Sequence, residues 1–229
     1  MSDEFLMNYF KDRKEAGQKL AEILKEKIKD GWFCFAIPNG GVIVGKEIAK
    51  KLKIPLRLMV VRKVLYPFTS EAGFGAIDPE GNVVLEEIPY SQEIIKNQIE
   101  KARKSVEERL KKFKKWADYK NLSGKKIILT DDGLASGYTM LTAVKFLKRK
   151  KSKKIIVAVP CASVGAVNLI KPEVDELISL YIKKELPFAV ADFYENWYDV
   201  SDEEVIRMLN TKNKISKIQT KNRNQDVKN

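Results

Sequence analysis

The chain has 229 residues, of which 44% are hydrophobic, and this is enough to bury one substantial core in a single domain with an appendage. Histidine is absent, which excludes a Ser-His-Asp or Cys-His mechanism and any zinc site with a histidine ligand. The formal net charge is +12. Residues 211–229 hold six Lys or Arg against one Asp, so the residues before them carry a net charge of +7. This positive charge suits small polyanionic substrates as well as nucleic acid.

Neither a membrane span nor a signal peptide is expected. No window approaches the roughly 18 uninterrupted apolar residues of a spanning helix. The amino terminus, MSDEFLMNYFKDRKEAG, is too acidic and interrupted for a signal peptide. Cys34 and Cys161 lie in or beside apolar runs without metal-ligand spacing, as reduced core cysteines do. We therefore expect a cytoplasmic protein.

Hydrophobic spacing predicts alternating helices and strands in the first quarter of the chain. The expected elements are a helix from Phe10 to Ile28, a strand at 32–37, a turn at 38–41, a helix at 42–52 and a strand at 56–61 that ends at Arg62 and Lys63.

The pattern changes to a glycine-rich segment at residues 66–88. Short apolar runs at 74–77 and 83–85 flank a turn at 78–81, which predicts a hairpin inside a mobile loop. Ser91 is a typical helix cap, and the apolar stripe after it, from Ile95 to Trp116, predicts a long solvated helix.

The remaining elements continue the alternation. We expect strands at 127–129, 155–160 and 177–181, helices from Tyr138 and at 164–170, and a final helix that Ser201 caps and that ends at Leu209. This order predicts a parallel sheet with helices on both faces. The polar segment 211–229 is expected to be a basic disordered tail.

The segment IILTDDGLASGYTM, residues 127–140, carries the strongest chemical signal. Its strand delivers Asp131 and Asp132 to the carboxyl end of a sheet, where open α/β sheets bind ligands. The small-residue loop 133–137 then leads into a helix, so its amides and the hydroxyls of Ser136 and Thr139 would form an anion site. Two acids beside such a site fit a ribose 5-phosphate. The acids would accept hydrogen bonds from the ribose hydroxyls, and the anion site would bind the phosphate.

This segment resembles the signature of the type I phosphoribosyltransferases: an apolar strand, two acids, and then Ser136, Gly137, Tyr138 and Thr139. The resemblance implies a central parallel sheet with flanking helices and a small hood. It implies transfer of ribose 5-phosphate from phosphoribosyl pyrophosphate (PRPP) to a nitrogen acceptor, typically a nucleobase, with Mg²⁺ carried by PRPP. Asp131 and Asp132 would be catalytic, and Ser136, Gly137 and Thr139 would hold the 5-phosphate. The substrate-binding residues of this loop would also include Gly133, Leu134, Ala135 and Tyr138.

A second glycine-rich turn, IPNGGVIVGKE, follows the first predicted strand. It is not a nucleotide-triphosphate P-loop, because Glu47 replaces the Ser or Thr that would bind magnesium. It resembles the pyrophosphate loop of the same family, with Asn39, Gly40 and Gly41 in place. Relatives often have Arg where this chain has Asn39, so Arg62 and Lys63 are candidates for supplying the missing charge, although both also fit a solvated strand end.

The acceptor site is less well defined. The run PFAVADFYENWYDV resembles the segment in which purine-salvaging members stack an aromatic ring on the base, and Phe188 takes that position or packs in the core. Oxopurine enzymes carry an acid where this chain has Ala135. The chain thus resembles an uncharacterised branch of the family more than its well-described nucleobase enzymes.

Residues 1–210 are predicted to form the phosphoribosyltransferase domain, with 66–121 as an inserted hairpin, lid and long helix, and the resemblance implies a homodimer. Two alternatives stay open at this point: a PRPP-sensing regulator that binds nucleic acid through its basic tail and the helix from Ser91 to Tyr119, and a non-catalytic sugar-phosphate binding protein.

Overall fold

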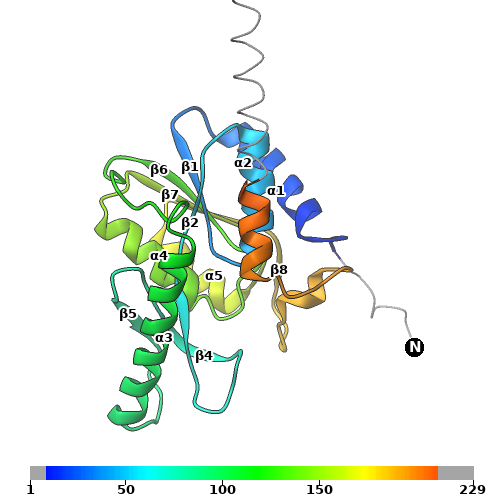
Figure 1. Cartoon of the computed structure of the whole chain (residues 1–229). Coiled ribbons are helices and arrows are strands. Elements are labelled where there is room, and N and C mark those ends of the chain that lie inside the picture. Colours follow the sequence, from blue (N-terminus) through cyan, green and yellow to red (C-terminus); the bar gives the residue numbers. More distant parts are fainter. Residues whose placement is uncertain (1–8, 211–229) are drawn as a thin grey trace, which may run out of the picture. The chain divides into compact units, whose positions relative to one another are not determined.

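The computed structural model describes residues 9–210. The chain divides into two units, one up to Trp197 and one from Tyr198 onward. Figure 1 shows the arrangement of the first unit. Its elements are α1 (Arg13–Lys27), β1 (Trp32–Ala36), α2 (Gly41–Leu52), β2 (Leu56–Leu58), β3 (Arg62–Leu65), β4 (Gly73–Ile77), β5 (Val83–Leu85), α3 (Gln92–Lys112), β6 (Lys126–Thr130), α4 (Tyr138–Arg149), β7 (Lys154–Ser163), α5 (Val164–Ile170), η1 (Lys171–Glu173), β8 (Glu176–Lys183) and η2 (Val190–Phe193).

The main sheet is parallel, in the order β2-β1-β6-β7-β8. Its strands are apolar on both sides because helices cover both faces. Cys34, Ile128 and Ile156 pack with α1 and α2, whereas Phe35 and Leu129 pack with α4. This alternation with a period of two confirms the predicted sheet with helices on both faces.

The first helix begins later than predicted. Asp12 caps α1 by accepting a hydrogen bond of 2.8 Å from the Glu15 amide. Phe10 lies outside the helix, because its backbone pairs with residues near Tyr194: its N–H donates to the Phe193 carbonyl at 3.0 Å and its carbonyl accepts from Glu195 at 2.8 Å. An apolar residue at helical spacing is therefore used here to join the amino-terminal segment to η2.

The predicted strand 56–61 is wrong in its second half. The main-sheet strand ends at Leu58, and the Val60 amide donates to the Tyr119 hydroxyl instead of a neighbouring strand. The chain then enters a separate antiparallel sheet, β3-β4-β5, in which Arg62 pairs with Ile77. Arg62 and Lys63 therefore begin a strand of the small sheet and do not end a strand of the main one.

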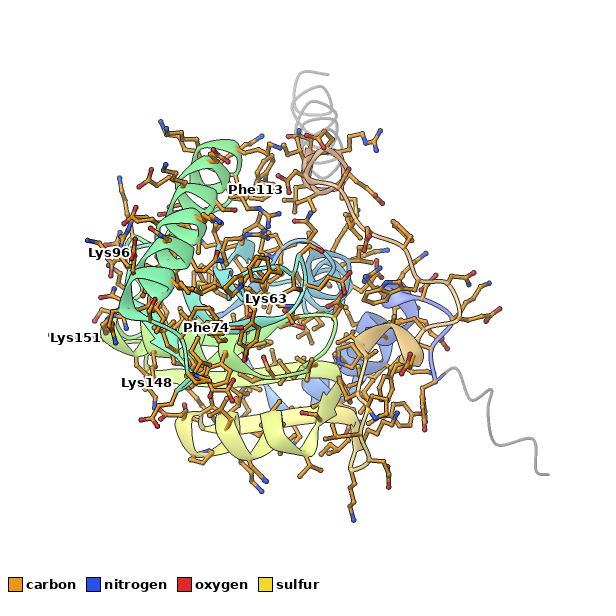
Figure 2. All side chains as sticks on the ribbon, turned by 90° about the horizontal axis from the view of Figure 1, so that it is seen from below. Lys63, Phe74, Lys96, Phe113, Lys148 and Lys151 are labelled. Atoms are coloured by element: carbon orange, nitrogen blue, oxygen red, sulfur yellow. The ribbon has the colours of Figure 1, made fainter. Side chains whose placement is uncertain are left out.

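The predicted hairpin is confirmed as β4 and β5, which pair with Ile77 opposite Val83. It is anchored on α4, because Arg149 forms an ion pair with the buried Asp78. Thr142 Oγ1, which donates to the Tyr138 carbonyl at 2.8 Å, also lies 3.5 Å from the Ala76 carbonyl. Helix α3, which Ser91 caps as predicted, packs on β3 and β4. In Figure 2, Lys63 and Phe74 are labelled on these strands, and Lys96 and Phe113 on α3 and at its end. The mobility of the loop remains a prediction.

The unit from Tyr198 contains helical residues 202–210, and Ser201 Oγ accepts from the Glu204 amide at 3.1 Å. This confirms the predicted cap. The predicted domain limit at residue 210 stays a prediction, and the basic tail 211–229 lies outside the described residues. Among residues 9–210, no helix is long and apolar enough to cross a membrane.

Candidate functional site

Two loops meet at the carboxyl edge of the main sheet. One is the β1 loop, residues 38–41, and the other begins with Asp131 and Asp132 after β6. Strands β1 and β6 are neighbours with Ala36 opposite Thr130, and the Ile37 amide donates to the Thr130 carbonyl at 2.9 Å. The parallel register therefore brings together two segments that are about ninety residues apart in the sequence.

The glycines of the β1 loop allow the two acids to approach it closely. A Cβ on Gly40 would overlap Asp132 Oδ2, and a Cβ on Gly41 would lie 2.7 Å from Asp131 Oδ1. Any side chain larger than that of glycine would have to displace a carboxylate. The carboxylates of Asp131 and Asp132 therefore lie directly against Gly40 and Gly41.

Asp131 is held in an environment that opposes its ionisation. Its Oδ1 accepts a hydrogen bond of 2.9 Å from the Asp132 amide. Burial is the main cause that raises the pKa of Asp131 well above its ordinary value of 3.8, and the charge of Asp132 adds to it, while Lys63 acts in the opposite direction. A ligand that brings hydroxyl donors or a cation would relieve this cost, which is what a ribose diol with a metal ion supplies.

Asp132 forms an ion pair with a residue that the sequence analysis did not single out. Arg13 Nε lies 2.8 Å from Asp132 Oδ2, and the side chain of Arg13 is only 4% exposed. The face of Trp197 lies 3.7 Å from Arg13 Cζ. Helix α1 therefore delivers a buried guanidinium to Asp132.

The α4 loop, residues 133–137, is fixed to the end of β7. The Leu134 amide donates to the Cys161 carbonyl, the Leu134 carbonyl accepts from Ser163, and each bond is 2.9 Å. Ser163 Oγ donates to the Ala135 carbonyl at 2.6 Å and also accepts from Ala166, which caps α5. The side chain of Leu134 is buried in the core, so this residue holds the loop in place rather than facing a ligand.

The end of the α4 loop has the geometry expected of an anion site. Gly137 has a φ of +85°, and a Cβ there would lie 3.2 Å from Ala166. The amides of the first turn of α4 have no partner within the helix, as at the start of every α-helix. Ser136 is exposed and Thr139 half-buried beside them. A phosphate at this position would receive backbone and hydroxyl donors.

The structure separates the two candidate cations of the β3 strand. Lys63 is exposed, and its Nζ donates to the Glu71 carbonyl at 3.2 Å, yet its charge acts on Asp131. Arg62 turns to α3, where its Nε donates to Ser105 Oγ at 3.1 Å. Asn39 accepts from Arg109 of α3, so a guanidinium reaches the β1 loop from that helix.

Phe188 is half-buried and packs on Phe193, with 5.3 Å between the ring centroids. It follows the cis peptide bond between Leu186 and Pro187. Phe193 belongs to a cluster with Phe10 and Cys161. Packing thus occupies one side of the Phe188 ring, and stacking on a base remains a prediction.

Four residues at the site were missed because their partners are distant in sequence. Arg13 reaches Asp132, Arg109 reaches Asn39, Ser163 holds Ala135, and Tyr194 donates to the Asp132 carbonyl. The sequence offered a signal for Arg13 and Arg109, since each is a charged residue on the otherwise apolar buried side of an amphipathic helix.

Comparison with known proteins identifies the family. The model of the phosphoribosyl transferase domain matches residues 8–193, so the chain belongs to this family. Its fold is that of the type I phosphoribosyltransferases. A crystal structure of TT1426 from Thermus thermophilus is 29% identical, with a TM-score of 0.67, over 86% of this chain and 95% of that one.

The chain is also similar to two curated proteins and to a second solved structure. Proteins of two Mycobacterium tuberculosis strains, named "Putative phosphoribosyl transferase", are 32% identical over 208 residues, which are 89% of this chain and 47% of each relative. The chain therefore spans about half the length of these curated relatives. The AQ2163 protein of Aquifex aeolicus has a TM-score of 0.50 at 11% identity, over 76% of both chains, which is a likeness of fold alone.

Proposed function

We propose that the protein transfers ribose 5-phosphate from PRPP to a nitrogen acceptor, a nucleobase, and releases pyrophosphate. The observation that carries the proposal is the placement of Asp131 and Asp132 between the β1 loop and the α4 loop. One carboxylate pair thus lies between two backbone segments that can each bind an anion, as a sugar with phosphates at both ends requires.

Residues at different positions in the site bind different parts of the substrate. The first turn of α4, with Ser136 and Thr139, binds the 5-phosphate and fixes one end of the sugar. Asp131 and Asp132 accept hydrogen bonds from the 2- and 3-hydroxyls, each worth about 1.5 to 3 kcal/mol when charge-assisted. As the bond to pyrophosphate breaks, positive charge develops on the ribose ring, and the two fixed carboxylates stabilise it.

Magnesium is proposed as the cofactor, held mainly by the substrate. Among the described residues, no group of three or more His, Cys, Asp or Glu side chains could hold a metal ion. Mg²⁺ commonly combines one or two carboxylates with substrate phosphates and water, and Asp131 and Asp132 are suitable oxygen ligands. The ion would neutralise the charge of the leaving pyrophosphate.

Ala135 and Phe188 bear on the choice of acceptor. Ala135 offers no acid that could exchange a proton with an oxopurine, and Phe188 presents only part of its ring because Phe193 covers the rest. An acceptor that needs no proton exchange with the α4 loop is therefore favoured. We also propose a cytoplasmic homodimer, on the basis of the family, and sedimentation of the purified protein would measure its mass in solution.

Transfer is tested directly with magnesium, PRPP and a panel of nucleobases, with pyrophosphate release and the new nucleotide as readouts. Asp132→Asn should remove most of the transfer, and Asp30→Asn, an exposed acid outside the site, should leave it unchanged.

Two results would reject the proposal in favour of the alternatives. PRPP binding without transfer to any base would indicate a sugar-phosphate binding protein. Nucleic-acid binding that is strongly salt-dependent and responds to PRPP, again without transfer, would indicate a regulator.

A further inference from the structure

We infer that Arg13 is a diphosphate-binding cation of this site, and that the Asp132 carboxylate occupies the place of the diphosphate until the substrate arrives. The inference rests on the proposed function, because it assigns a further binding residue to the same site. It begins from the β1 loop, whose Asn39 brings no charge of its own to bind a diphosphate.

The space above Gly40 is already filled by an ion pair. A Cβ on Gly40 would overlap Asp132 Oδ2 and lie 2.8 Å from Arg13 Nε. The surface that the loop offers to a diphosphate therefore carries a carboxylate oxygen bound to a guanidinium. An anionic oxygen next to these backbone atoms and this cation is what the diphosphate would supply.

The burial of Arg13 makes an exchange of anions more favourable than simple loss of its partner. Its side chain is 4% exposed and its guanidinium lies against the Trp197 ring at 3.7 Å. A buried guanidinium that loses its counter-ion pays a large desolvation cost. The diphosphate would replace the carboxylate on Arg13, and Asp132 would become available to the ribose hydroxyls.

This exchange predicts that loss of the Asp132 charge changes the affinities for two ligands in opposite directions. A purely supporting role of Arg13 predicts no such difference. If Asp132 competes with diphosphate for Arg13, removing its charge strengthens the binding of inorganic pyrophosphate. The same change weakens the binding of ribose 5-phosphate, because the hydroxyls lose a charged acceptor.

The test is calorimetry of the full chain, with inorganic pyrophosphate and ribose 5-phosphate titrated separately at fixed magnesium. Asp132→Asn is expected to bind pyrophosphate about fivefold more tightly and ribose 5-phosphate about tenfold more weakly. Arg13→Gln is expected to lose about tenfold in pyrophosphate affinity while its ribose 5-phosphate affinity changes by less than about threefold. Arg13→Lys keeps the charge, and serves if the Gln variant does not fold, with an expected loss of about threefold for pyrophosphate.

Arg57→Gln is the matched control. Arg57 also pairs with an acid, Asp118, and its Cζ also lies over an aromatic ring, that of Phe33 at 4.9 Å. Its removal lowers the net charge equally and should leave both affinities unchanged. An equal loss of pyrophosphate binding in the Arg57 and Arg13 variants would show a general charge effect and overturn the inference.

The inference and the proposed function can fail separately. Unchanged pyrophosphate affinity in Arg13→Gln and Asp132→Asn, with the wild type binding both ligands, would overturn the role of Arg13 alone. If the affinities of the variants change in the expected directions but no base transfer is detected, the exchange of anions is supported and the proposed transferase function is rejected. A wild-type protein that binds neither ligand would overturn both.

Discussion

The hydroxyl of Tyr194 donates a hydrogen bond of 2.6 Å to the backbone carbonyl of Asp132. Burial, reinforced by the charge of Asp132, raises the pKa of Tyr194 far above its ordinary value of 10.0, so the phenol stays protonated and remains a donor. The ring packs beside Phe10, with 5.5 Å between centroids. The end of the chain's first unit thus fixes the backbone of an acid in the central loop.

Tyr194→Phe keeps the ring and removes this donor. We expect a loss of about 1 to 2 kcal/mol in the free energy of unfolding, because the buried carbonyl loses a partner. Urea denaturation monitored by tryptophan fluorescence measures it. The affinity for PRPP should fall as well, since the backbone of Asp132 is less firmly held. A variant as stable as the wild type, with unchanged PRPP affinity, would contradict this role.

Gly40→Ala is expected to lower PRPP affinity by at least about tenfold, because the new methyl group must displace the Asp132 carboxylate. Isothermal titration of PRPP measures the effect. Gly165→Ala is the control: its Cβ would meet only Ser163 Oγ, at 3.8 Å, within helix α5. That change should leave PRPP affinity intact and, by helix propensity, stabilise the fold by up to about 1 kcal/mol. Equal affinities for PRPP in the two variants would show that the close approach at Gly40 has no importance.

Asp131 should give the free protein a characteristic dependence of stability on pH. Its pKa is raised by folding, so the folded state holds the proton to higher pH than the unfolded chain does. The stabilising contribution of Asp131 to the folded state is fully present below its pKa in the unfolded chain, near 3.8. This contribution is lost as the pH rises through the pKa of Asp131 in the folded protein. Asp131→Asn should therefore be more stable than the wild type at neutral pH, and the difference should shrink towards acid.

Denaturation curves of the two proteins from acid to neutral pH provide the measurement, with Asp30→Asn as the exposed control. If the difference in stability between Asp131→Asn and the wild type grows towards low pH, the raised pKa of Asp131 is contradicted. The same variant should bind ribose 5-phosphate more weakly, because it loses a charged acceptor for the diol.

The anchoring of the hairpin predicts which part of the inserted segment can move. The β4 and β5 strands should be protected from hydrogen exchange, because they pair with each other and contact α4 through Ala76 and Asp78. The turn at residues 66–71 carries the fully exposed Phe68 and should exchange faster. If this turn closes over the substrate, PRPP will slow its exchange. Equal protection of the strands and the turn in the free protein would contradict the assignment.

Local patterns in the sequence were sufficient to predict most elements. The helix 164–170 has the predicted bounds, Ser91 and Ser201 cap helices as expected, and the strand before Asp131 runs from Lys126 to Thr130. Hydrophobic periodicity, caps and turn residues act within a few positions, so the sequence displays them directly. The same patterns failed at Val60, whose amide bonds to a tyrosine hydroxyl 59 positions away.

The sequence by itself determined the two acids, the glycine-rich turns and the start of α4 after Gly137, because each depends on neighbouring residues. Only the tertiary structure decided which charges surround them. Arg13 and Asp132 are 119 positions apart, and Asn39 and Arg109 are 70 apart, so their pairing follows from strand order and helix packing. Long-range electrostatic partners leave no local trace in a sequence, whereas the fold brings them within a few ångströms of each other.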